Sequence, residues 1–219
     1  VKFKAEKFGV NLSGARFINL EKNEHADRLT AALFEARKSK GVSLEQAREL
    51  MRDRTYFATM MVKEGLAHAM VSGANTTTAH TIRPALQIIK TRPDSPLVSS
   101  SFIMCFDEDI LIYADCAINP NPDAQQLAQI ALVSADTARA FGLEPRVAML
   151  SYSSGDSGSG ADIDLVRSAG EIARGLAPAL KIEAPVQYDA AIDPAVARKK
   201  LPNSDVAGCA NVFVFPNLN

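Results

Sequence analysis

The sequence predicts an α/β fold in which most strands of the sheet run parallel. Segments of helical periodicity alternate with short apolar runs through the second half of the chain, as in folds built from strand–helix units. The run "RVAMLSY" (residues 146–152) is nearly continuously apolar, which is typical of a strand covered on both faces. A length of 219 residues fits one large domain or two smaller ones. We place a boundary in the stretch "TRPDSP" and predict domains at residues 1–92 and 93–219.

The N-terminal part of the chain is predicted to be mainly helical. Apolar side chains recur at a helical period over residues 25–40, and Gly41 is well placed to end that helix. Ser43 and Gln46 have the spacing of a capping box, so "LEQARELMRD" is predicted as a second helix. The segment "YFATMMVKEG" indicates a third helix, which ends at Gly65.

A strand, a polar loop and a helix are predicted next. The apolar run "HAMVS" indicates a short buried strand, and the hydroxyl-rich stretch "SGANTTTAHT" follows it as a loop. Pro84 suits the first turn of a helix, where its missing N–H has no cost. We therefore expect this helix to start at Pro84, to run through "ALQIIK" and to end before Pro93.

The second half of the chain is predicted to form a sheet with connecting helices. The β-rich runs "PLVSSSFIMCF" and "ILIYADCAI" flank "DED" and indicate an antiparallel hairpin. A long helix over "PDAQQLAQIALVSADTARAFG" is expected to stop at Gly142. The remaining predicted elements are the strand "RVAMLSY", a Gly/Ser loop "SSGDSGSG", a helix "ADIDLVRSAGEIARGLA", a strand near "LKIEAPVQ", a helix "PAVARKK" and a strand "NVFVFP".

Composition narrows the function classes. The chain has 24 Lys and Arg against 25 Asp and Glu, so it lacks the basic excess of a protein that binds nucleic acid. It has no apolar run near 18 residues, and its N-terminus lacks the apolar core of a signal peptide, so we expect a cytoplasmic protein without a membrane partner. The three cysteines form no CxxC pair and the three histidines show no ligand spacing, which predicts no metal site. We expect each cysteine to be a small buried side chain.

Two strand-to-helix loops are candidates for binding an anion. They are "SGANTTTAHTIRP" and "SYSSGDSGSGAD", both rich in glycine and hydroxyl groups. Ligands of open α/β sheets bind beyond the carboxyl ends of the strands, and a helix N-terminus favours anions. Arg83 adds a planar charged group that suits phosphate. Neither loop matches a P-loop or a dinucleotide-binding pattern, so an ordinary polar turn remains the alternative.

Other polar residues have two interpretations each. Arg37 lies at the end of a predicted helix, where a cation is favourable in any case. His80 has the chemistry of a general base, but no accompanying nucleophile can be identified. Asp115 and Asp189 lie at strand ends, where they fit either a polar site or a helix cap.

Several long strings of the sequence resemble the phosphate acetyltransferase (phosphotransacetylase) family. They include "RKSKGVSLEQARELMRD", "VSGANTTTAHTIRPALQIIKT", "ADCAINPNPDAQQLAQIA", "AFGLEPRVAMLSYSSGDSG" and "QYDAAIDPAVARKKLPNSDVAGCANVFVFPNLN", in order from about Gly9 to the last residue. The resemblance implies two α/β domains with a cleft, as in isocitrate and isopropylmalate dehydrogenases, with an incomplete first domain. It implies reversible acetyl transfer between acetyl phosphate and coenzyme A, no permanently bound cofactor, and a homodimer.

The resemblance also indicates which residues bind the substrate phosphates. Arg37 matches a family arginine in "RKxKG", and Arg83 matches the arginine of "TxRP". The loop at Thr78 and the loop that starts at Ser151 match segments that border the family's cleft. The predicted substrate-binding residues are Arg37, Ser72, Gly73, Thr76, Thr77, Thr78, Arg83, Ser151, Tyr152, Ser153 and Ser154.

The sequence departs from the family at some points. His80 stands where the family more often has Asp or Asn, and Ser154 where Thr is usual. The family's catalytic serine, arginine and aspartate are expected beyond Asn219, so we expect the chain to be part of a longer protein and inactive alone. Two other functions fit the resemblance. One is a non-catalytic acetyl-CoA-sensing domain of a multidomain malic enzyme, and the other is a phosphate butyryltransferase.

Overall fold

The chain forms two compact units in the computed structural model, which describes residues 2–20, 22–93, 95 and 97–219. Unit 1 is Val1–Lys90 and unit 2 is Thr91–Asn219. Unit 1 is helical, and unit 2 contains a mixed sheet that is mostly parallel and is covered by helices. The α/β class and the largely parallel sheet predicted from the sequence are thus confirmed.

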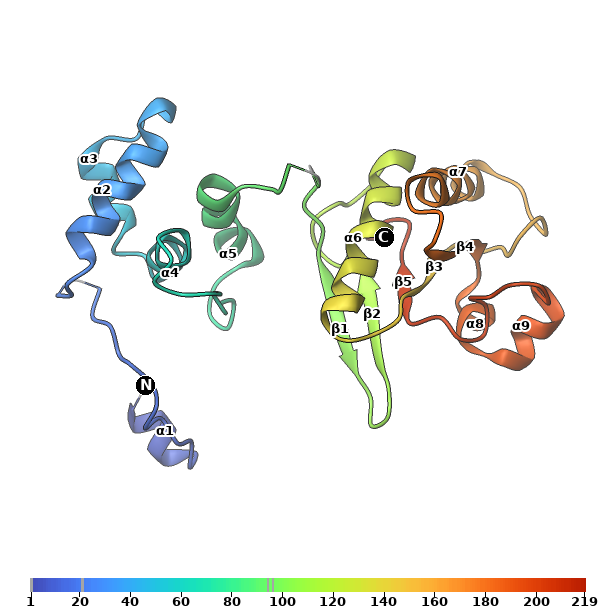
Figure 1. Cartoon of the computed structure of the whole chain (residues 1–219), viewed down its shortest axis with the longest axis horizontal. Helices are drawn as coiled ribbons and strands as arrows, with labels where there is room; N and C mark the ends of the chain where they lie inside the picture. The colour runs from blue at the N-terminus through green and yellow to red at the C-terminus, as the bar shows by residue number, and fades with distance from the viewer. Residues whose placement is uncertain (1, 21, 94, 96) are drawn as a thin grey trace. The chain divides into compact units, whose positions relative to one another are not determined.

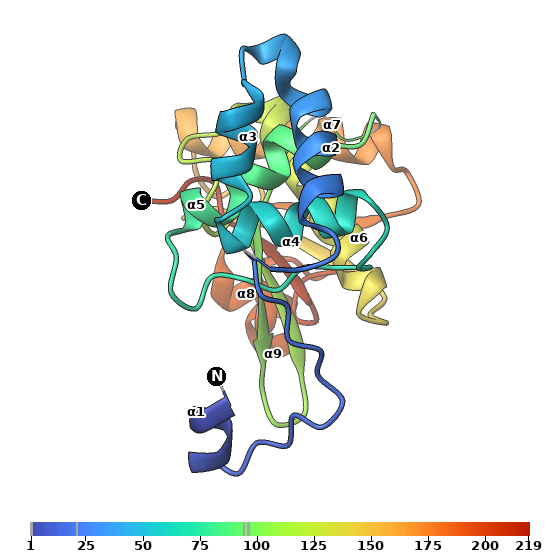
Figure 2. The ribbon, with the colours of Figure 1, turned by 90° about the vertical axis from the view of Figure 1, so that its left-hand side faces the viewer.

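In unit 1, short helices between Ala26 and Ile89 pack around one small core (Figure 1). Leu29, Leu33 and Met60 are fully buried in that core. Helices α2 and α3 lie side by side (Figure 2). The helical segments are α1 (Lys2–Lys7), α2 (Ala26–Arg37), η1 (Lys38–Lys40), α3 (Leu44–Leu50), α4 (Arg54–Lys63), α5 (Thr78–Pro84) and η2 (Ala85–Ile89).

Local sequence signals set most of the helix ends in unit 1. Gly41 takes a left-handed conformation with φ of 81° and follows η1, as predicted. The capping box is also confirmed, because Gln46 N donates to Ser43 Oγ at 3.1 Å and Ser43 N donates to Gln46 Oε1 at 2.8 Å. Helix α4 begins after Asp53, whose carboxylate accepts two backbone N–H groups of the first turn.

Two predictions for unit 1 are wrong. The run "HAMVS" forms no strand, and the side chain of Val71 is fully exposed, because no described residue of unit 1 belongs to a strand that could pair with it. Pro84 does not start a helix; it is the last residue of α5. The hydroxyl of Thr77 caps α5 by accepting from His80 N, so the helix starts six residues earlier than predicted and continues into the π-helical turn η2.

Unit 2 contains one five-stranded sheet in the order β1-β2-β5-β3-β4. Strands β1 and β2 are antiparallel, which confirms the predicted hairpin, and the other pairs are parallel. The loop end of this hairpin extends past the other strands (Figures 1 and 2). The strands are β1 (Ser101–Cys105), β2 (Ile110–Ala114), β3 (Arg146–Leu150), β4 (Lys181–Val186) and β5 (Val212–Val214).

Helices cover both faces of the sheet (Figure 1). The residues of β3 alternate between two cores: Val147 and Met149 pack with α6 and α7, whereas Ala148 and Leu150 pack on the side of α8 and α9. Both faces are therefore apolar, as the sequence of this strand predicted. The helices are α6 (Ala124–Ala140), α7 (Ala161–Leu176), α8 (Tyr188–Ile192) and α9 (Pro194–Lys200).

The prediction that all three cysteines are buried is wrong. Cys105 and Cys209 are exposed and Cys116 is half-buried. Cys105 ends the edge strand β1, and Cys209 lies in the connection that precedes β5. Both positions are at the periphery of unit 2, where a small apolar side chain is not enclosed.

Candidate functional site

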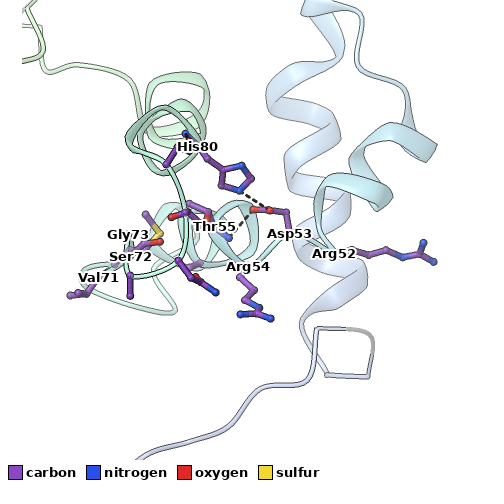
Figure 3. Close-up of a pocket in the computed structure, with 14 residues that line it drawn as sticks. Arg52, Asp53, Arg54, Thr55, Val71, Ser72, Gly73 and His80 are labelled. Carbon is purple, nitrogen blue, oxygen red and sulfur yellow. Dashed lines mark hydrogen bonds and ion pairs between the residues drawn. The ribbon is translucent and has the colours of Figure 1, made fainter. Parts of the chain in front are cut away.

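The hydroxyl-rich loop of unit 1 borders a cavity of about 670 Å³, hereafter the loop cavity (Figure 3). Four predicted substrate-binding residues line it: Ser72, Gly73, Thr76 and Thr77. Its other wall comes from the start of α4, at Arg52, Asp53, Arg54 and Thr55, together with His80 of α5. The sequence interpretation missed this second wall.

Asp53 links the two walls of the loop cavity. Its Oδ1 accepts from Thr55 N at 2.9 Å and from Tyr56 N at 3.1 Å, which caps α4. Its Oδ2 lies 2.8 Å from His80 Nε2, and His80 points toward it from α5 (Figure 3). Both carboxylate oxygens are therefore engaged, so this carboxylate repels an incoming anion less than a free one would.

The loop cavity has one arginine without a carboxylate partner. Arg52 forms an ion pair with Glu49 at 2.8 Å and points away from the segment Val71–Gly73 (Figure 3). Arg54 makes no ion pair with any residue that the structure describes. With the loop hydroxyls and the free backbone N–H groups nearby, the cavity offers donors that suit an anion.

The two arginines predicted to bind phosphate belong to a second group, the arginine–tyrosine cluster of Arg37, Tyr56, Arg83 and Gln87. Tyr56 donates its hydroxyl to Gln87 Oε1 at 2.8 Å, and Arg37 Nη1 donates to Gln87 O at 3.5 Å. Burial raises the pKa of the Tyr56 phenol, and the positive charges of Arg83 and Arg37 act against that rise. Both guanidinium groups are thus close enough to act on one phenol, although the two arginines are far apart in the sequence.

The remaining predicted residues of unit 1 have clear positions. Thr78 is the exposed first residue of α5 and does not line the loop cavity. Arg83 is exposed on the same helix, and Arg37 is the half-buried last residue of α2. Tyr56 and Gln87 were not predicted, because neither residue stands in a motif and only packing brings them together.

In unit 2, the predicted loop residues differ in burial and in hydrogen-bond partners. Ser153 and Ser154 are buried. Ser153 Oγ lies 2.8 Å from Ser157 Oγ, and Ser154 Oγ accepts from Gln187 N at 2.9 Å. Tyr152 is exposed, whereas Ser151 Oγ is enclosed and has no hydrogen-bond partner among the described residues. The hydroxyls of Ser153 and Ser154 therefore stabilise the loop, and their availability to a ligand is reduced.

Gln187, which contacts Ser154 of this loop, also bonds to a lysine of α9. Lys200 Nζ donates to Gln187 Oε1 at 2.9 Å and to Asp189 Oδ2 at 2.9 Å. The hydrogen bond from Lys200 lowers the pKa of the Asp189 carboxyl. Asp189, which the sequence left as either a cap or a site residue, serves here as the partner of a lysine.

Asp115 holds the turn after β2. Burial on its own would raise the pKa of this carboxyl, but hydrogen bonds from the Ser100 hydroxyl, from the backbone of Ala117 and Ile118, and from the Asn119 amide together lower it. The carboxylate is only 5% exposed. The carboxylate caps no helix, because the next helix, α6, begins only after Asp123; Asp115 instead accepts from the backbone of the turn at residues 117–119.

Within residues 2–20, 22–93, 95 and 97–219, the structure contains no group of three or more His, Cys, Asp or Glu side chains able to hold a metal ion. None of the helices in this part of the chain has the length and apolar character needed to cross a membrane.

The sequence and the fold of the chain are similar to those of known proteins. The sequence model of the family described as phosphate acetyl/butaryl transferase matches residues 1–219. The chain therefore belongs to this family of acyltransferases.

Individual relatives support this assignment. The chain is 56% identical over 211 residues to a phosphate acetyltransferase of Nitratidesulfovibrio vulgaris, covering 96% of this chain and 30% of that protein. It is similar to the solved structures of a phosphotransacetylase from Staphylococcus aureus (42% identity, TM-score 0.87, 99% of this chain and 67% of that one) and of one from Streptococcus pyogenes (46%, 0.85, 98% and 65%). The chain thus spans about a third of the N. vulgaris protein and about two thirds of the two structures.

Proposed function

We propose that this chain is part of an enzyme that transfers an acetyl group reversibly between coenzyme A and inorganic phosphate. The observation that carries the proposal is the family match over residues 1–219, together with 56% identity to a protein named phosphate acetyltransferase. The names of the similar proteins favour acetyl transfer over butyryl transfer and over a role as a sensing domain.

The polar groups of unit 1 suit this chemistry. A thiolate attacks the carbonyl carbon of acetyl phosphate, and phosphate leaves with the electron pair of the broken C–O bond. The reactants carry several negative charges, so cations and N–H donors are needed to bind them and to stabilise the developing oxyanion. Arg37 and Arg83 supply such charges beside Tyr56, and Arg54 supplies another at the loop cavity.

We propose substrate-binding roles for the residues that the resemblance indicated. The set in unit 1 is Arg37, Ser72, Gly73, Thr76, Thr77, Thr78 and Arg83, and the set in unit 2 is Ser151, Tyr152, Ser153 and Ser154. The arginines bind phosphate groups of coenzyme A or acetyl phosphate, and the loops donate neutral hydrogen bonds. Coenzyme A acts as a substrate, and the reaction needs no permanently bound cofactor.

We further propose that the enzyme acts in the cytoplasm as a homodimer, and that the boundary between its two α/β domains lies between residues 92 and 93. Sedimentation equilibrium tests the assembly, since a homodimer gives twice the mass of one chain and a monomer gives 23.5 kDa.

Calorimetry with coenzyme A and the 219-residue chain tests substrate binding. Arg83→Ala should weaken binding about 10- to 100-fold, because a charge-assisted hydrogen bond to phosphate contributes about 1.5–3 kcal/mol. Arg28→Ala is the matched control, since Arg28 is an exposed arginine of unit 1 that pairs with Glu64 and does not line the loop cavity. Unchanged affinity in Arg83→Ala would remove Arg83 from the site, and no binding by the unsubstituted chain would oppose the proposed function. Comparing acetyl-CoA with butyryl-CoA tests the acyl preference.

A further inference from the structure

His80 is a polar residue of the loop cavity whose role neither the family resemblance nor the proposed function explains. It is the third residue of α5, and its backbone N–H donates to the cap hydroxyl of Thr77 at 3.2 Å. Its ring Nε2 lies 2.8 Å from Asp53 Oδ2, on the residue that caps α4. Since Nε2 is already bonded to a carboxylate, the contact points to a role in holding two helices together.

Two side-chain contacts connect helix α5 and its extension η2 to α4 and its cap residue. The first is the His80–Asp53 pair, and the second is the hydrogen bond between Tyr56 and Gln87 Oε1 at 2.8 Å. The two contacts are coupled, because Asp53 Oδ1 also accepts from the backbone N–H of Tyr56 at 3.1 Å. One carboxylate therefore sets the position of both attachment points on α4.

In the sequence, Arg83 lies between His80 and Gln87, the two residues that make these contacts. His80, Arg83 and Gln87 are spaced at i, i+3 and i+7, so they share one side of the helical segment. The guanidinium of Arg83 is near enough to Tyr56 to act on its pKa. A rotation or shift of α5 would move Arg83 relative to Arg37, which is on a different helix.

The loop before α5 depends on the same attachment. The structure describes no hydrogen bond from residues 71–75 to the rest of the chain. The loop is fixed at one end by Met70, whose sulfur accepts from Thr59 Oγ1 at 3.6 Å. At the other end it joins the first turn of α5, where Thr76 Oγ1 lies 2.8 Å from Thr81 Oγ1. The position of that turn relative to α4 depends on His80 and Asp53.

We propose that Asp53 and His80 form a positioning pair that holds Arg83 and the Ser72–Thr78 loop in the arrangement that binds the phosphate groups of coenzyme A. The inference rests on the proposed function and deepens it. Neither residue takes part in the acyl transfer. Their effect on binding passes through Arg83 and the loop, and this route distinguishes the pair from a direct ligand or a general base.

A double-mutant cycle tests whether the effect of His80 on coenzyme A binding passes through Arg83. Coenzyme A affinity is measured by calorimetry for the 219-residue chain with His80→Ala, Arg83→Ala and both substitutions. His80→Ala should weaken binding about three- to tenfold, as expected for a lost hydrogen bond between partly exposed groups. In the Arg83→Ala background the same substitution should have less than half of that effect on a logarithmic scale, because the residue that it positions is absent.

Two further variants separate positioning from stability. His80→Gln retains a side-chain N–H donor of similar reach and should restore most of the affinity, which also covers the case in which His80→Ala does not fold. His68→Ala is the matched control, since His68 is an exposed histidine of the same unit that does not line the loop cavity. Its affinity should equal that of the unsubstituted chain.

The outcomes distinguish this inference from the proposed function. Unchanged affinity in His80→Ala, or additive losses in the double variant, would overturn the positioning pair and leave the proposed function standing. If the unsubstituted chain does not bind coenzyme A, the proposed function fails and the positioning pair fails with it.

Discussion

The two units differ in how completely their apolar segments are enclosed. In unit 2, strand β3 is flanked by β4 and β5 in the sheet, and its side chains enter apolar cores on both faces. In unit 1, the comparably apolar run "HAMVS" forms no strand, and Val71 is fully exposed. The difference shows that an apolar run becomes a strand only where a neighbouring strand satisfies its backbone.

The two units also differ in how many hydrogen bonds hold their polar loops. The Gly/Ser loop of unit 2 directs the hydroxyls of Ser153 and Ser154 inward, where they have partners within unit 2. The residues 71–75 of unit 1 have no described hydrogen bond to the rest of the chain, and their loop borders a cavity. We therefore expect the free energy of unfolding to depend mainly on unit 2 and ligand binding mainly on unit 1, and substitutions in both units test this contrast.

The largest stability effect is expected at Asp115 in unit 2. Asp115→Ala should lower the free energy of unfolding by about 2–4 kcal/mol, because several partly buried donors lose their acceptor at once. Urea denaturation followed by far-UV circular dichroism measures the loss, since the chain has no tryptophan. Asp156→Ala, at a fully exposed aspartate of the Gly/Ser loop of unit 2, is the control and should change the free energy little.

The Asp115 effect should also depend on pH. The pKa of this carboxyl is lowered in the folded state, so its stabilisation is complete above the ordinary carboxyl pKa of about 4 and is lost as the pH falls through the folded value. The difference between Asp115→Ala and the unsubstituted chain should therefore shrink in acid. A difference that grows as the pH falls from 7 would contradict the assignment of Asp115 as an ionised acceptor that holds the turn after β2.

Two glycines of α7 test how tightly unit 2 is packed. A Cβ at Gly170 would overlap the Cβ of Ala184 on β4, whereas a Cβ at Gly175 has no atom within 4 Å. Gly170→Ala should cost about 1–3 kcal/mol through overpacking. Gly175→Ala, in the same helix, should instead stabilise by up to about 1 kcal/mol. Equal effects of the two substitutions on the urea midpoint would contradict the close contact of α7 with β4.

A smaller effect is expected at the helix cap in unit 1. Ser43→Ala should lower the free energy of unfolding by about 1 kcal/mol, because the backbone N–H of Gln46 loses its acceptor. Ser43→Asp retains an acceptor at the cap and should restore the stability. A loss above that for Asp115→Ala would reverse the contrast between the units.

The smallest effect should come from Val71. Val71→Ala should change the free energy of unfolding by less than about 0.5 kcal/mol, as is usual for an exposed side chain. Val147→Ala in β3 is the matched comparison, and the loss of a fully buried side chain should cost about 2 kcal/mol or more. A large loss from Val71→Ala would restore the predicted buried strand.

The sequence predicted most elements of unit 2 because their signals are local. The capping of α6 by Asp123, the left-handed Gly142 and the apolar pattern of β3 each depend on a few neighbouring residues. Helix α8 was missed because its five residues are too short to show a period. The position of Pro84 was predicted wrongly because the helix that contains it starts earlier, after the Thr77 cap.

The candidate site was predicted only in part, for a physical reason. Arg37, Arg83 and the hydroxyl loop stand in recognisable strings, so the resemblance located them. The His80–Asp53 and Tyr56–Gln87 contacts join residues that are 27 and 31 positions apart. Such contacts depend on how α4 and α5 pack, and no local pattern encodes that packing.

We propose that coenzyme A binds to the loop and the arginines of unit 1. Hydrogen–deuterium exchange of the 219-residue chain, with and without saturating coenzyme A, tests this binding site. Slower exchange is predicted for the amides of residues 72–83, with a smaller change at 151–158. Unchanged exchange at 72–83, or protection confined to the pocket of unit 2 lined by Phe106, Arg146 and Cys209, would contradict this binding site.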